Sequence, residues 1–267
     1  MLAFANAKIN LGLSVTEKRA DGYHNIETVF YPVNLCDVIE ITDDPETVCV
    51  IKGIDIPGNA SDNLCLKAFE ALQKDFKLPA QQITLLKNIP VGAGLGGGSS
   101  DAAHLIKLVN DKFKLGMSVE TMQDYARVLG ADCAFFIENK PAYAFGKGDE
   151  FSSVAVDLSK YHLVLVKPEI HVSTADAYAG IKPTIPSRSV KDLIHLPIEE
   201  WKAHLKNDFE SSVFSKYPEI ERIKSKLYQS GALFSLMSGS GSSVFGIFDH
   251  QVSLPDLEEN NKVFYNV

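Results

Sequence analysis

A dense run of glycine and serine between a predicted strand and a predicted helix restricts this chain more than any other feature. The run occupies residues 90–103 and reads PVGAGLGGGSSDAA. Glycine lets the backbone approach a bound anion and adopt positive φ, and the first N–H groups of a following helix donate to phosphate. A plain loop gains no packing from so many glycines. The run therefore predicts a phosphate-binding loop and nucleotide binding.

The segments on either side of the loop follow regular patterns. Residues 83–89 are expected to form a strand before it. A helix is expected after it, with Ser99 or Ser100 as the N-cap, because apolar residues follow at helical spacing: Ala102, Leu105, Ile106 and Val109.

Two common phosphate loops do not fit this context. A Walker A loop needs a lysine after its second glycine, and residues 90–103 contain none. Three glycines of the run match the G-x-G-x-x-G dinucleotide fingerprint, which requires a strand after the helix. A second helix is predicted there instead, with Ser118 as its cap and Gly130 at its end. The loop is therefore expected to belong to another class of nucleotide-binding protein.

Periodicity outside the loop predicts a mixture of strands and helices. We expect strands at 4–15, 26–33, 38–42, 48–52, 163–166, 233–237 and 244–248, antiparallel in large part. We expect helices at 62–76, just after Ser173 and across 220–227, and a surface stretch at 182–197. In the first strand, alternation places Lys8 and Asn10 on the same face.

Three motifs together resemble the GHMP kinase superfamily. Residues 7–11 (AKINL) resemble its first motif, residues 90–103 its second and residues 237–243 (MSGSGSS) its third. The resemblance implies an α+β, two-lobed GHMP kinase architecture. Its N-terminal lobe would be ribosomal-protein-S5-domain-2-like and its C-terminal lobe a ferredoxin-like α/β-sandwich. We place the boundary in a turn-rich segment, giving an ATP-binding domain at 1–152 and a C-terminal domain at 153–267.

Shorter segments narrow this resemblance. Residues 8–11 (KINL), 21–24 (DGYH) and 130–136 (GADCAFF) resemble the branch that phosphorylates the 2-hydroxyl of 4-diphosphocytidyl-2-C-methyl-D-erythritol in the non-mevalonate (MEP) isoprenoid pathway. This resemblance implies an ATP-dependent phosphotransferase that uses Mg²⁺. Kinases of homoserine or mevalonate would share the three motifs and should lack DGYH. A noncatalytic nucleotide- or RNA-binding module is a further alternative.

The resemblance assigns roles to particular residues. Asp132 would accept the proton of the acceptor hydroxyl, and Lys8 would stabilise this aspartate and the transferring phosphoryl group. By pattern alone, Lys8 would be a solvent-facing strand residue and Asp132 a turn residue. Asn63 would reach the adenine, with a helix N-cap as the equal alternative. The loop residues expected to bind ATP are Pro90, Val91, Gly92, Ala93, Gly94, Leu95, Gly96, Gly97, Gly98, Ser99 and Ser100, with Ser99 or Ser100 near Mg²⁺.

The resemblance also implies an acceptor site. Tyr23 and Tyr178 would sandwich the cytosine, and such stacking is worth about 1–3 kcal/mol per base. His24 would hydrogen-bond the edge of the cytosine. The remaining residues expected at the polyol or the phosphates are Asn10, Thr174, Gly239 and Ser240.

Two positions depart from the family pattern. Asn6 stands where the family usually has proline, a change that should leave Lys8 in place. Asp101 stands where relatives often have alanine or asparagine. We expect Asp101 in the first helical turn, directed outward because phosphate is near.

Charge and cysteine content limit the partners. The chain has 26 basic and 34 acidic residues, a net charge of −8, and no basic aromatic patch. We therefore expect a small-molecule substrate, with no nucleic acid or membrane as partner. The four cysteines form no C-x-x-C pair, and neither a signal segment nor a membrane-spanning stretch is recognisable. Reduced thiols and a cytoplasmic location are expected.

Overall fold

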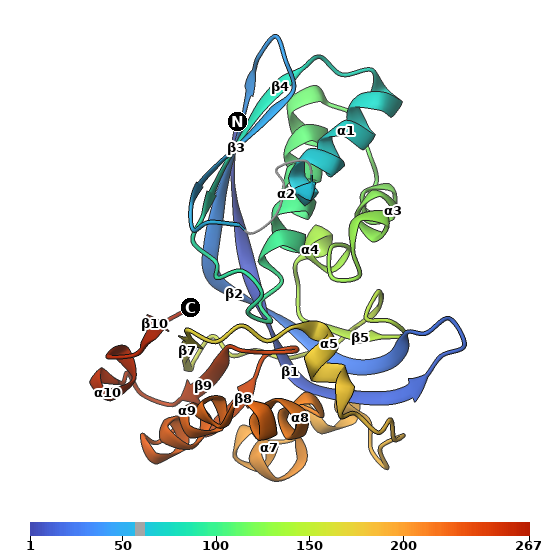
Figure 1. Ribbon diagram of the computed structural model, residues 1–267. Helices are drawn as coiled ribbons and strands as arrows, with labels where there is room; N and C mark the ends of the chain where they lie inside the picture. The colour runs from blue at the N-terminus through green and yellow to red at the C-terminus, as the bar shows by residue number, and fades with distance from the viewer. Residues whose placement is uncertain (57–61) are drawn as a thin grey trace. The chain divides into compact units, whose positions relative to one another are not determined.

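The chain forms two compact units, each built from separate stretches of sequence (Figure 1). The computed structural model describes residues 1–56 and 62–267. Unit 1 contains Met1–Ala7, Leu35–Val91 and Gly96–Lys140. Unit 2 contains Lys8–Asn34, Gly92–Leu95 and Pro141–Val267. The division into domains at 1–152 and 153–267 stays a prediction.

Two long strands contribute to both units. They are β1 (Leu2–Lys18) and β2 (His24–Asp43), which pair with each other. The sequence predicted two strands within 26–42, but they form one, because β2 pairs with a different neighbour along each half of its length. Residues 7–15 of β1 are buried on both faces, so its alternation does not mark a solvent side.

Unit 1 places three strands beside its helices. The second half of β2 pairs antiparallel with β4 (Gln81–Lys87), which pairs in parallel with β3 (Val48–Gly53). The helices of this unit gather on one side of the strands (Figure 1). They are α1 (Leu64–Phe76), α2 (Gly97–Phe113), α3 (Val119–Leu129) and α4 (Phe135–Glu138).

The helix ends of unit 1 follow their capping residues. Ser118 accepts a hydrogen bond from the Thr121 N–H and begins α3, and Gly130 follows its last residue, as predicted. The N-cap of α2 is Gly96, with φ of +68° and no side-chain hydrogen bond. The prediction that Ser99 or Ser100 caps this helix was wrong, because the chain turns into the helix through a left-handed glycine.

Unit 2 contains two sets of paired strands. The first half of β2 pairs antiparallel with β5 (Ala142–Phe145), which pairs antiparallel with β6 (Glu150–Ser153). The second set is a four-stranded antiparallel sheet in the order β10–β7–β9–β8. Its strands are β7 (His162–Pro168), β8 (Phe234–Met237), β9 (Val244–Phe248) and β10 (Asn261–Tyr265).

Helices cover the four-stranded sheet of unit 2. The apolar core joins residues of β7 and β9 to α8, α9 and two residues of β1, Leu13 and Val15. The stretch 182–197 was expected on the surface, but its residues Val190 and Ile194 are buried. The helices of this unit are α5 (Thr174–Ala179), α6 (Val190–Leu193), α7 (Ile198–His204), α8 (Phe209–Lys216), α9 (Pro218–Gln229) and α10 (Pro255–Glu258).

The structure bears on two compositional expectations. Within residues 1–56 and 62–267, no helix has both the length and the apolar character needed to cross a membrane. All four cysteines are in the described part, and each is a free thiol.

Candidate active site

Lys8 and Asn10 lie together on β1, and both are buried. Their exposed fractions are 3% and 2%. The Lys8 Nζ donates to Asn10 Oδ1 at 2.6 Å and to the Gly94 carbonyl at 3.3 Å, and it lies 4.7 Å from the centre of the Phe30 ring. A buried ammonium requires such partners. Lys8 is therefore a fixed positive charge and not the solvent-facing residue that strand pattern alone predicts.

The Asn10 side chain is held by its own partners. Its Nδ2 donates to Thr28 Oγ1 at 2.9 Å, and Thr28 Oγ1 donates to the Gly12 carbonyl at 2.5 Å. The Asn10 backbone N–H donates to Ser238 Oγ at 3.2 Å. With Nδ2 donating to Thr28, the carbonyl oxygen of the amide faces the Lys8 ammonium.

Gly94 allows two backbone segments to touch. Its φ is +78°, and a Cβ built there would lie 1.9 Å from the Ser238 carbonyl oxygen. The Ser238 Oγ also donates to the Gly94 carbonyl at 2.8 Å. A side chain at this position would therefore separate the glycine loop from the third motif.

The middle of the glycine loop is anchored on two sides within unit 2. The Lys8 backbone N–H donates to the Leu95 carbonyl at 3.0 Å, and the Ser243 N–H donates to the Ala93 carbonyl at 3.2 Å. The first, second and third motifs, which are far apart in the sequence, thus meet here.

Asn207 shapes the turn of the third motif, and sequence reasoning missed it. Its Nδ2 donates to the carbonyls of Met237 and Gly239, both at 2.8 Å, and its side chain is buried. Gly239 is buried with φ of +55°, and Ser240 is half-buried. No motif or periodicity surrounds Asn207 in the sequence, so a single sequence offers no signal for its role.

The aromatic residues expected at the cytosine are arranged differently from a simple sandwich. The rings of His24 and Tyr178 stack, with centroids 4.8 Å apart and an interplanar angle of 24°. Tyr23 is 63% exposed, and the Lys147 ammonium lies 5.4 Å from its ring centre. His24 thus stacks on Tyr178, and Phe209 packs against the same ring edge-to-face, with centroids 4.7 Å apart. Thr174 is exposed at the start of α5.

In unit 1, the beginning of α2 presents backbone donors. The first N–H groups of any helix lack partners inside that helix, and they attract anions together with the helix dipole. Gly96 begins α2 and has no side chain that could cap these groups. At the start of the loop, Pro90 is buried and Val91 is exposed.

The structure distinguishes Ser99 from Ser100. Ser100 is fully buried, and its Oγ donates to the Asn6 carbonyl at 2.6 Å and lies 3.2 Å from His104 Nδ1. Ser99 is half-buried and interacts with the Cys133 thiol. Of the two hydroxyl-bearing side chains, that of Ser99 is the more exposed, and a position of either one near Mg²⁺ stays a prediction.

Asp132 lies in the turn after α3, next to the beginning of α2. The turn is closed by a hydrogen bond from the Cys133 N–H to the Gly130 carbonyl at 3.2 Å. A Cβ at Gly130 would meet the Cys133 sulfur at 3.3 Å and the Ser99 Oγ at 3.9 Å. Burial raises the pKa of Cys133 to about 11, so its thiol stays protonated at neutral pH. Asp132 is half-buried beside this neutral thiol.

Asn63 caps α1. Its Oδ1 accepts a hydrogen bond from the Cys65 N–H at 2.8 Å. The N-cap alternative is therefore confirmed, and contact with adenine stays a prediction.

Comparison with known proteins identifies the family. The profile of the GHMP kinases N terminal domain matches residues 63–140, and that of the GHMP kinases C terminal matches residues 189–266. A 4-diphosphocytidyl-2-C-methyl-D-erythritol kinase of Bacteroides fragilis is 53% identical over 262 residues, covering 97% of this chain and 96% of the relative. The chain belongs to the 4-diphosphocytidyl-2-C-methyl-D-erythritol kinase family of GHMP kinases.

Further members of the 4-diphosphocytidyl-2-C-methyl-D-erythritol kinase family agree. The Cytophaga hutchinsonii protein is 52% identical over 93% of each chain, and that of Pelodictyon phaeoclathratiforme is 40% identical over 94% of this chain and 90% of the relative. A crystal structure of 4-(cytidine 5'-diphospho)-2C-methyl-D-erythritol kinase superposes with a TM-score of 0.80 at 30% identity, covering 99% and 98% of the chains. The two-lobed α+β GHMP kinase fold is thus confirmed.

Other GHMP kinases share only the fold. The structure of homoserine kinase from Cytophaga hutchinsonii gives a TM-score of 0.64 at 15% identity, over 100% of this chain and 94% of that one. The branch predicted from residues 8–11, 21–24 and 130–136 is therefore favoured over the homoserine and mevalonate alternatives and over a noncatalytic module.

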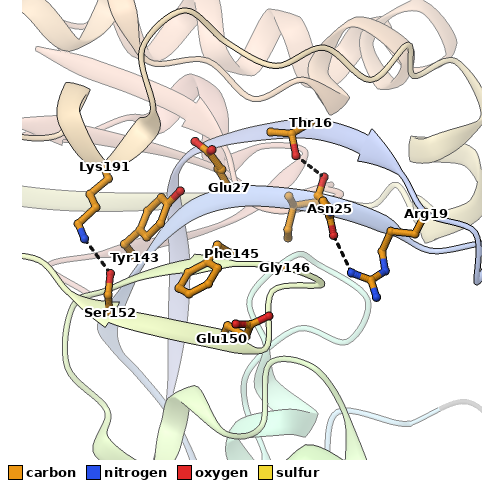
Figure 2. A pocket seen from close by; sticks show the side chains of 11 residues that line it. Thr16, Arg19, Asn25, Glu27, Tyr143, Phe145, Gly146, Glu150, Ser152 and Lys191 are labelled. Atoms are coloured by element: carbon orange, nitrogen blue, oxygen red, sulfur yellow. Dashed lines mark hydrogen bonds between the residues drawn. The ribbon is translucent and has the colours of Figure 1, made fainter.

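A separate open pocket of about 580 Å³ lies in unit 2 (Figure 2). At one end, the Lys191 Nζ donates to Ser152 Oγ at 3.1 Å, and at the other, Arg19 donates to Asn25 Oδ1 at 2.9 Å. None of the residues that line it belongs to the predicted site. They are Thr16, Arg19, Asn25, Ile26, Glu27, Tyr143, Phe145, Gly146, Glu150, Ser152 and Lys191.

Proposed function

We infer that this chain phosphorylates the 2-hydroxyl of 4-diphosphocytidyl-2-C-methyl-D-erythritol with ATP, a step of the MEP pathway. The observation that carries the inference is the 53% identity to a kinase of that name over 97% of this chain. The meeting of the three motifs around Lys8 and Gly94 supports it, because phosphoryl transfer depends on fixed positions more than on covalent chemistry of the protein.

Lys8 and Asp132 are the proposed catalytic residues. The acceptor oxygen forms a bond to the γ-phosphorus as the bond to ADP breaks, and the hydroxyl proton passes to Asp132. Lys8 stabilises the negative charge of the transferring group. Its burial and its bond to Asn10 favour this role, since a charge that is already oriented needs little reorganisation during the reaction.

The glycine loop is the proposed triphosphate site. The backbone N–H groups at the start of α2 would bind phosphate oxygens, and Gly239 and Ser240 would close over the transferring group. Mg²⁺, when bound, neutralises the phosphate charge. The donors present suit it, because Ser99 offers a hard oxygen and Mg²⁺ keeps several waters. Residues 1–56 and 62–267 contain no cluster of three His, Cys, Asp or Glu side chains that could hold a metal.

The acceptor's cytosine is proposed to bind between Tyr23 and Tyr178, with His24 at its edge. For this arrangement the His24 ring must leave its stack on Tyr178, so binding should reorient His24. Asn10 and Thr174 would contact the polyol or the phosphates.

We also propose that the enzyme acts in the cytoplasm without nucleic-acid or membrane partners. The free thiols fit a reducing compartment, and the net charge of −8 disfavours polyanionic surfaces.

The test is ATP consumption with Mg²⁺ and each of three alcohols: 4-diphosphocytidyl-2-C-methyl-D-erythritol, mevalonate and homoserine. Mass spectrometry identifies the product. We expect one added phosphate on the cytidine compound alone. Phosphorylation of another alcohol would keep the Lys8 and Asp132 chemistry and reject the cytosine site.

Asp132→Asn separates catalysis from binding. We expect ATP binding to persist while turnover falls by about 100-fold or more, because the hydroxyl loses its proton acceptor. Asp124→Asn, at an exposed acid of the preceding helix, is the matched control and should leave turnover unchanged. Equal turnover in the Asp132 variant would reject its assignment.

A further inference from the structure

Three ionisable side chains are buried together in unit 1, and none of them is a proposed catalytic residue. They are Asp37 of β2, Lys87 at the end of β4 and Asp101 of α2, with exposed fractions of 0%, 2% and 2%. Asp101 was expected to point outward from the first turn of α2. That prediction was wrong, since Asp101 lies beyond the first turn and faces inward to Lys87.

These side chains connect the two ends of the glycine loop. The Asp37 Oδ1 accepts hydrogen bonds from the backbone N–H groups of Asn88 at 2.5 Å and Ile89 at 2.8 Å, just before the loop. The Lys87 ammonium bonds Asp37 Oδ2 and also donates to Asp101 Oδ2 at 2.7 Å, in α2 just after the glycines and serines of the loop. One ammonium thus joins the chain entering the loop to the helix leaving it.

The network lies close beneath the first turn of α2. A Cβ at Gly97 would meet Ile89 Cγ2 at 2.9 Å and the Lys87 Nζ at 3.4 Å. The Ile89 N–H is itself bonded to Asp37. The first turn of α2 therefore packs directly on Lys87 and on Ile89, whose backbone is bonded to Asp37.

Burying these three side chains is energetically unfavourable compared with an apolar core. Removing three ionisable groups from water carries a large desolvation penalty, and a single ammonium faces two carboxyl groups. Asp101 Oδ1 is buried and has no hydrogen-bond partner among the described residues. Apolar side chains of similar volume would fill the same space without that penalty. The directional bonds of the network, however, would be lost.

We propose that Lys87 and Asp101, together with Asp37, are positioning residues that hold the start of α2 where its N–H groups bind the ATP phosphates. The proposal rests on the inferred kinase function and on the binding of ATP at this loop. None of the three side chains is required to touch ATP. Their effect passes through the backbone of residues 88–89 and of α2.

The test compares Lys87→Met and Asp101→Asn with the parent enzyme. A misplaced helix start should weaken ATP binding, so we expect the KM for ATP and the Kd for ADP to rise by about tenfold or more. The KM for the acceptor alcohol should change by less than about threefold. Asp101→Asn keeps the size of the side chain and decides the matter alone if Lys87→Met does not fold.

Two control variants separate position from stability. Lys112 lies in the last turn of α2 and forms an ion pair with Asp43, whose side chain is 85% exposed. Lys112→Met removes this ion pair and should leave the KM for ATP unchanged. Ile41→Ala destabilises the same unit from the buried β2 strand without touching the network. If Ile41→Ala raises the KM for ATP as much as the network variants do, or if the network variants leave it unchanged, the proposal is overturned.

Direct nucleotide titration distinguishes this proposal from the proposed function. If the parent enzyme binds ADP but phosphorylates none of the alcohols, the function fails while the ADP affinities of the variants still decide the positioning role. If the parent enzyme phosphorylates the cytidine compound and the variants bind ADP normally, only the positioning role fails.

Discussion

At the scale of single residues, Gly94 leaves no room for a side chain. Gly94→Ala would combine a left-handed backbone with a Cβ 1.9 Å from the Ser238 carbonyl oxygen. We expect a loss of activity of about 100-fold or more, because the glycine loop must move away from the third motif. Steady-state assays and thermal unfolding measure the two effects.

Gly116→Ala is the matched control for this change. Gly116 also has positive φ, +67°, but a Cβ there would meet nothing within 4 Å. Gly116→Ala should lower the free energy of unfolding only by the backbone strain, about 1–2 kcal/mol, and should retain activity. If both variants keep activity equally, close contact between the two motifs is not needed for function.

Single residues also show where a sequence is insufficient. The pattern of β1 correctly placed Lys8 and Asn10 on one face, but burial on both faces depends on neighbours distant in the sequence. Asp101 was misplaced for the same reason, since its partner Lys87 is on another element. The stacking of Tyr178 on His24 could not be predicted either, because it depends on tertiary packing.

At the scale of elements, α2 contributes a pH-dependent stability through Asp101. Burial, with the nearby Asp37 carboxylate, raises the pKa of Asp101 to about 7, although Lys87 opposes the shift. A carboxyl group whose folded pKa is raised binds a proton that the unfolded chain releases. Its stabilising contribution is therefore complete below about pH 4 and is lost as the pH rises through about 7.

Asp101→Asn should remove this contribution. We expect the free energy of unfolding of the parent, relative to the variant, to decline between about pH 5 and pH 8 in urea titrations. Comparison with the variant cancels other groups, including His104, whose pKa burial lowers to about 4. A difference that rises over this range would contradict the prediction.

The turn of the third motif gives a second prediction at this scale. Asn207→Ala removes three hydrogen bonds, because it leaves the carbonyls of Met237 and Gly239 without this donor and the Phe209 N–H without its acceptor. Since each lost buried bond costs about 1–3 kcal/mol, we expect a clear drop in unfolding temperature and in activity. Asn261→Ala, which loses one bond at a half-buried helix end, should have a smaller effect and full activity.

Helices and strands were predicted from the sequence more successfully than side-chain positions. The strand before the loop, α2, α3, α5, α9 and the strands around the third motif follow periodicity and capping residues. The strand β10 and the short helices α7, α8 and α10 were not predicted, because each is only a few residues long and is defined by its packing.

At the scale of the whole molecule, the two units do not correspond to two consecutive pieces of sequence. The core of unit 2 includes Leu13 and Val15 from β1 together with Val164 and Phe209. We predict that residues 153–267 expressed alone do not fold cooperatively, because they lack the buried strand residues that complete this core. Circular dichroism melting of the fragment and the full chain is the measurement, and a sharp transition in the fragment would contradict it.

The order in which the chain is synthesised gives the shared strands a further consequence. Residues 8–34 leave the ribosome early, but most of their partners in unit 2 follow residue 140. At about 5–20 residues per second, the apolar β1 segment waits about 5–20 seconds before the first of those partners is synthesised. Unit 2 can therefore close only near the end of translation, and a nascent chain paused before residue 140 would be a natural client for a chaperone.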